Sequence, residues 1–275
     1  MIWFYKISFS AILIPLINKY VYDLLCFVHL YFLKQSFKYY TMYKKILFLA
    51  CCVLTLAACN YERGSGNIIK QERAVGNFSS LRVTSGIDVV VTIGTPQTVM
   101  VEADDNIIEF IETNLDNEEL EITLKSGITI NNAIRKIYIT TPTLNSLSAS
   151  SSASILVKGI ISGNEEIKLA ASSSGSIKTA LQAPRVNAKA SSSGTIKISG
   201  KTKSFEAQSS SSGEVAAENL LSENTDVKAS SSGSCVVHAS VNLNAKASSS
   251  GSVEYKGNPQ LKVEESSSGK VRAVN

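Results

Sequence analysis

The feature that most constrains the fold of this 275-residue chain is a repeated Ser-Ser-Ser-Gly motif in its second half. Six copies occur, and a degenerate one, Ser150 to Ala153, precedes them. Their last residues lie 18 to 22 positions apart, at Ala153, Gly175, Gly194, Gly213, Gly233, Gly251 and Gly269. A period of this length is typical of proteins that stack one short supersecondary unit on the next.

Apolar and polar residues alternate on both sides of each motif. Two residues after its last position stand Ile155, Ile177, Ile196, Val215, Cys235, Val253 and Val271. Six residues before it stand Leu147, Leu169, Ala188, Ala207, Val227, Ala245 and Val263. Alternation with period 2 is typical of strands with one buried face. Each repeat is therefore predicted to be a strand, a serine-rich corner, a second strand and a variable return.

We predict an all-β fold, a right-handed parallel β-helix or β-solenoid with about seven coils over residues 146–275. The motif glycines are expected to be corner residues, because corners often need a positive φ that glycine adopts cheaply. The serines are expected to keep each corner small and to bond neighbouring backbone. An antiparallel β-sandwich would show the same alternation and stays open, although the constant spacing favours the solenoid.

Residues 67–145 lack the motif and are predicted to be a β-rich part that covers the N-terminal end of the solenoid. Within them, the apolar residues of Asn106 to Asn114 predict a short helix. We expect no separate cap after the last coil. Glu264, Glu265, Lys270 and Arg272 instead place charge on its edge, which discourages aggregation between edges.

The leader indicates export and lipid attachment. Residues 42–58 combine a positive start, a short apolar run and a Leu-Ala-Ala ending before Cys59, a pattern similar to the bacterial lipoprotein lipobox. We expect Cys59 to become the acylated N-terminus and residues 59–66 to form a tether, so that the partner of this end is a membrane. Residues 1–41 are interpreted as an extension from a start codon assigned too far upstream; a genuine N-terminal membrane segment is the alternative.

Charge and cysteine usage agree with this division. The net charge of +4 divides into +5 for residues 1–59 and −1 for the rest. A nucleic-acid partner is therefore not expected, because it needs a concentrated basic surface. Beyond Cys59 the only cysteine is Cys235, so an internal disulfide in the exported body is excluded.

The stretch Val83 to Gly94, VTSGIDVVVTIG, together with the repeats and the lipobox, resembles the putative auto-transporter adhesin head GIN domain family, which is common in Bacteroidetes. Gly86, Ile87 and Asp88 correspond to the name-giving Gly-Ile-Asn, with Asp in place of Asn. The resemblance covers about residues 67–272. It implies a solenoid-like protein of the cell envelope and offers no catalytic residues.

The residues that carry chemistry are sparse. Residues 146–275 contain one aspartate, one histidine and two aromatic residues, so no catalytic residue, metal site or cofactor is predicted. His238 is expected at the surface and Cys235 in the core. Asp104-Asp105 and residues 116–119 could hold calcium, but turn and cap roles are favoured.

The resulting hypothesis is a lipid-anchored outer-membrane protein, facing the periplasm or the cell surface, that acts as a non-catalytic structural or adhesin-like module. Its partner would be an unidentified glycan or protein. One alternative is a carbohydrate-active β-helix enzyme that uses some of Glu165, Glu166, Glu214, Glu218, Glu254, Glu264 and Glu265. Another is an assembly module that self-associates end to end through the terminal coil.

Overall fold

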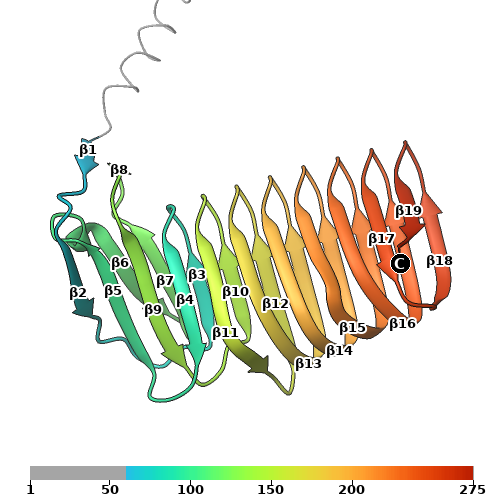
Figure 1. The fold of residues 1–275 in the computed structure, drawn as a ribbon, viewed down its shortest axis with the longest axis horizontal. Helices are drawn as coiled ribbons and strands as arrows, with labels where there is room; N and C mark the ends of the chain where they lie inside the picture. The colour runs from blue at the N-terminus through green and yellow to red at the C-terminus, as the bar shows by residue number, and fades with distance from the viewer. Residues whose placement is uncertain (1–59, 275) are drawn as a thin grey trace, which may run out of the picture. The chain divides into compact units, whose positions relative to one another are not determined.

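The computed structural model describes residues 60–274, which form an all-β solenoid with a single 3-10 turn (Figure 1). The N-terminal elements are β1 (Asn60–Arg63), β2 (Ile68–Glu72), β3 (Ser80–Val83), β4 (Asp88–Ile93), β5 (Thr98–Asp104), η1 (Ile108–Phe110), β6 (Ile111–Asp116), β7 (Glu119–Leu124), β8 (Ile128–Asn131), β9 (Arg135–Thr141) and β10 (Ser146–Ala149). The repeat elements are β11 (Ser154–Ser162), β12 (Glu166–Ala171), β13 (Ser176–Ala190), β14 (Thr195–Ser209), β15 (Glu214–Ala229), β16 (Ser234–Ala247), β17 (Ser252–Lys256), β18 (Gln260–Glu265) and β19 (Lys270–Ala273).

Parallel pairing between equivalent positions of successive coils confirms the solenoid. In β13 and β14, Ile177 pairs with Ile196 and Ala188 with Ala207. Each long strand runs from one corner to the next and so contributes to both sides of the coil. A sandwich of antiparallel strands is excluded for the repeats, because β10 to β19 pair with one another in parallel.

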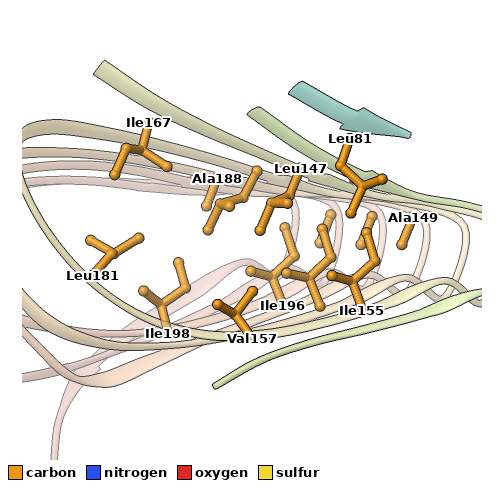
Figure 2. Close-up of a cluster of buried hydrophobic side chains, with 14 of the residues drawn as sticks. Leu81, Leu147, Ala149, Ile155, Val157, Ile167, Leu181, Ala188, Ile196 and Ile198 are labelled. Atoms are coloured by element: carbon orange, nitrogen blue, oxygen red, sulfur yellow. The ribbon is translucent and has the colours of Figure 1, made fainter. Parts of the chain in front are cut away.

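The core lies between the two sides of the stacked coils. Figure 2 shows side chains from the strands before the corners, such as Leu147 and Ala188, pointing toward those from the strands after them, such as Ile155 and Ile196. These four residues are at most 1% exposed. Because each inward position repeats in every coil, the apolar contacts form continuous columns along the solenoid.

The predicted reason for the corner glycines is wrong. The left-handed residues are the second and third serines, for example Ser211 with φ 48° and Ser212 with φ 61°, whereas Gly213 has no positive φ. The Gly213 N–H donates to the Ser210 carbonyl at 2.8 Å, which closes a tight turn. Glycine is needed for space instead, since a Cβ at Gly213 would lie 2.5 Å from the carbonyl carbon of Ala190 in the preceding coil.

The boundary predicted between residues 67–145 and 146–275 does not divide the structure. β3 and β4 flank a corner of their own, and β10 and β11 stack directly on them in parallel. β7 and β9 add a further layer before β3 and β4. The solenoid therefore begins within the N-terminal part, and β2, β5 and β6 complete its end through antiparallel pairs.

Two local predictions in this part differ from the structure. The helix expected over residues 106–114 is only the short η1, after which β6 pairs with β7, Ile111 opposite Leu124. The described part of the expected tether, residues 60–66, is not free either, because β1 pairs in parallel with β8. In both segments the pairing with a distant strand, which local sequence does not show, decides the conformation.

Candidate interaction surfaces

The first outer surface, which we call the amide face, is the outward side of the strands that precede the corners. Amide side chains there bond across neighbouring coils: Asn187 to Glu206 at 3.1 Å, Asn242 to Asn224 at 2.7 Å, and Asn244 to Asp226 at 2.7 Å. At its C-terminal end Lys246 and Glu264 form an ion pair at 2.7 Å. Stacking places these groups in columns with the spacing of parallel strands, about 4.8 Å.

The opposite surface, the hydroxyl face, is the outward side of the strands that follow the corners. Its first column consists mainly of hydroxyl side chains, at Ser154, Ser176, Thr195, Ser234 and Ser252. The column two residues further along contains the exposed Lys178 and Lys197 and ends at Glu254 and Arg272, where Arg272 Nε donates to Glu254 at 3.0 Å. Both faces therefore offer repeated polar groups rather than one concentrated site.

A groove of about 500 Å³ lies on the edge opposite the serine corners. It opens where the first repeat coil is interrupted between β11 and β12, while β13 and β14 continue without a break. Its polar lining includes Asn164, Gln182, Lys201, Lys203 and Glu223. No pattern in the sequence indicates this groove, although the shared register of Gln182 and Lys201 follows from aligning the repeats.

The structure does not gather the glutamates of the enzyme hypothesis into one site. Glu254 lies on the hydroxyl face, and Glu264 lies on the amide face on the other side of the core. Among residues 60–274, no cluster of three His, Cys, Asp or Glu side chains could hold a metal ion. The half-buried His238 accepts a bond from Ser222 at 2.9 Å through its carbonyl oxygen, not its ring.

Cys235 is a buried residue of the core, as predicted. Its side chain has 0% exposure, and its thiol donates to Ser209 Oγ at 3.2 Å. Burial raises the pKa of the Cys235 thiol to about 12. The reactive thiolate is therefore disfavoured, and this residue is unsuited to nucleophilic chemistry.

The acidic pair Asp104-Asp105 fastens the N-terminal segment to the body. The buried Asp104 accepts backbone N–H bonds from Gly66 at 2.6 Å and Ile134 at 2.7 Å. Asp105 accepts bonds from Ser65 at 2.5 Å and Asn67 at 2.8 Å, and these bonds lower the pKa of its carboxyl. The favoured turn and cap role describes this pair better than calcium binding.

The tripeptide Gly86-Ile87-Asp88 lies at the first corner of the stack. Gly86 has a φ of 63°, and its N–H donates at 2.8 Å to Ser151 in the next corner. Ile87 is fully buried, and Asp88 starts β4 opposite Ser154. The six motif glycines are buried at the later corners. Cys59 lies outside the described residues, and no helix among those residues is long and apolar enough to cross a membrane.

Comparison with known proteins now identifies the family. Residues 77–259 match the family described as "Putative auto-transporter adhesin, head GIN domain". The chain belongs to the head GIN domain family. The match begins just before β3, so it includes the Gly86-Ile87-Asp88 corner as well as the serine repeats.

Solved structures share the head GIN domain fold. A putative adhesin from Bacteroides fragilis has a TM-score of 0.73 and 19% identity, and the match covers 78% of this chain and 100% of that one. A putative lipid binding protein from Parabacteroides distasonis has a TM-score of 0.65 and 21% identity, with the same coverage. At these identities the likeness shows the fold alone. A search of curated proteins gives no match.

Proposed function

We propose that this head GIN domain protein is a lipid-anchored envelope protein that acts as a non-catalytic, adhesin-like interaction module. The observation that carries the proposal is the regular presentation of polar groups on two opposite faces of one continuous parallel stack. Membership of a family described as adhesins supports a location in the cell envelope or at its surface. The Leu-Ala-Ala-Cys ending of the leader supports acylation of Cys59 at the outer membrane.

The amide face suits a partner with a repeating polar structure, such as a glycan. Its amide and acid groups are already ordered by bonds between coils, so little side-chain entropy is lost when a partner binds. The neighbouring groove adds Lys201 and Lys203, whose charge favours acidic sugars. A protein partner with an acidic surface is the other outcome that the binding test distinguishes.

A binding assay with the purified acylated chain tests the interaction. Bacterial and host polysaccharides, with and without acidic sugars, are the probes, and both binding and released products are measured. We expect saturable binding without turnover, and a weakening of about tenfold in the double variant Lys201→Gln/Lys203→Gln. The matched control is Lys178→Gln/Lys197→Gln on the hydroxyl face. Turnover that disappears with Glu→Gln substitutions would instead support the enzyme alternative.

Mass spectrometry and protease shaving test the anchor and its location. We expect the mature N-terminus to be an acylated Cys59, and Cys59→Ser to release the chain from membranes. Shaving of intact cells distinguishes the two orientations, because only surface display makes the domain accessible to protease. An unacylated N-terminus in membrane fractions would contradict the lipid anchor.

A further inference from the structure

The described chain leaves almost no spacer between the proposed anchor and the folded body. β1 begins at Asn60, directly after Cys59, and Tyr61 pairs with Thr129 of β8. The Arg63 carbonyl accepts a bond from Asn106 at 2.9 Å. An extended chain spans at most about 3.6 Å per residue, so Arg63 lies within about 14 Å of Cys59. A bilayer attached at Cys59 would therefore touch this end of the domain.

Exposed apolar side chains lie close to this entry point. Ile68 of β2 is 47% exposed, Ile134 just before β9 is 42% exposed, and Tyr61 of β1 is 60% exposed. Ile68 pairs with Asp104, and the Ile134 N–H donates to that same residue at 2.7 Å, so the two isoleucines flank Asp104 in adjacent chain segments.

Asp104, which lies between the two isoleucines, does not expose its charge to solvent. Asp104 is only 3% exposed, and its two carboxylate oxygens accept the N–H groups of Gly66 and Ile134. The charge is therefore compensated and covered. The exposed apolar groups at this place are the two isoleucines, with the tyrosine of β1 on the segment that leads to the anchor. The exposed Asp105 lies beside them and is bonded to Ser65 and Asn67, so its polar neighbours would face the headgroup layer.

We propose that Tyr61, Ile68 and Ile134 form a membrane-contact surface that seats this end of the solenoid on the bilayer holding Cys59. This inference rests on the lipid anchor of the proposed function. Tyrosine suits the interface between lipid and water, and isoleucine gains by leaving water for the acyl boundary. Because β18 and β19 lie at the other end of the stack (Figure 1), the amide face, the hydroxyl face and the groove extend away from this contact.

Site-specific fluorescence tests the membrane-contact surface in the acylated chain. Ile68→Cys and Ile134→Cys are each labelled with an environment-sensitive dye, and the protein is incorporated into phosphatidylcholine vesicles with and without brominated acyl chains. Cys235 is buried with a thiol pKa of about 12 and should not react in the folded protein. The matched controls are Ile160→Cys and Val241→Cys, whose parent side chains are 57% and 49% exposed within the repeats.

We expect brominated lipid to quench the dye at positions 68 and 134 at least threefold more than at positions 160 and 241. Equal quenching at all four positions, or none at 68 and 134, overturns the membrane-contact surface. Flotation of the chain with vesicles and the mass of its N-terminus are measured in parallel. If Cys59 is acylated and the chain floats while the dyes stay unquenched, the membrane-contact surface is wrong, but the lipid anchor is supported. If Cys59 is unmodified and the chain does not float, both proposals fail.

Discussion

At the scale of the residue, the serine corners place two successive L-amino acids in left-handed backbone. Tight turns with two positive φ values usually contain Asn-Gly, because glycine carries no steric penalty there. In this chain each corner bonds to the next instead, as where the Ser193 N–H donates to the Ser211 carbonyl at 3.1 Å. The backbone bonds repeated along the edge offset the cost of each strained turn.

Gly213→Ala is expected to destabilise the solenoid by about 1–3 kcal/mol or more, since the added Cβ would overlap the backbone of Ala190 and force two coils apart. Urea unfolding of both proteins measures the change. The reverse substitution Ala153→Gly is the control, because that corner already holds a Cβ. A Gly213→Ala protein as stable as the parent would show that close approach is not what selects glycine.

Cys235 should resist alkylation by iodoacetamide at pH 8 in the folded protein and react only after unfolding. Its pKa in the fold, about 12, exceeds the ordinary value of 9.0, so the folded state keeps the proton that the unfolded state loses. The stability tied to this group is therefore complete below pH 9 and falls as the pH rises from 9 toward 12. Rapid modification at pH 8 under native conditions, measured by mass spectrometry, would contradict the burial.

At the scale of the element, the last strand of the amide side, β18, differs from its predecessors at one inward position. Glu265 pairs with Ala247 and continues a column of small buried residues, Ala149, Ala171, Ala190, Ser209, Ala229 and Ala247. Its carboxylate accepts the Val271 N–H of β19 at 2.5 Å. This group could not remain charged beneath a further coil without a large desolvation cost.

Glu265→Ala is therefore expected to permit end-to-end association, because β18 then presents Leu261 and Val263, which are 47% and 40% exposed, without an inward charge. Light scattering after size-exclusion chromatography should show dimers or larger species at concentrations where the parent chain is monomeric. The outward-facing Glu264→Ala on the same strand is the control. A parent chain that already associates through this edge would contradict the role assigned to Glu265 and restore the assembly hypothesis.

At the scale of the whole molecule, the stability of a stack depends on nearest neighbours, so equal residues contribute unequally along it. Leu243 and Leu261 occupy the same column in adjacent coils and pair directly, yet Leu243 is 1% exposed and Leu261 is 47% exposed. Leu243→Ala should cost about 2–5 kcal/mol of unfolding free energy. Leu261→Ala should cost about 1 kcal/mol or less. Equal losses in urea unfolding would indicate that another chain covers the last coil.

Much of the fold could be predicted because the same local pattern of apolar and polar residues recurs in every repeat. Inward residues such as Ile177 and Ile196 recur at one position in successive repeats, and a column of equal residues has few alternative registers. The failures concern segments without repetition. η1, β1 and β6 depend on partners far away in the sequence, and no periodicity indicated those partners.

The candidate surfaces, too, could be predicted only where they depend on the repeats. Outward residues such as Asn224 and Asn242 could be aligned from the repeats, but their 2.7 Å bond and the groove beside β12 depend on how the coils stack. The sequence by itself determined the period, the inward columns and the family, because each depends on patterns of residues that are close together along the chain. Only the tertiary structure decided that the serines adopt the left-handed conformation and that glycine is needed for close contact. The reason is that the backbone of the neighbouring coil, which local sequence does not show, leaves no room for a Cβ at the glycine. It likewise decided that the Glu265 carboxylate accepts the Val271 N–H at 2.5 Å, because no local pattern specifies how β18 and β19 approach each other across the corner.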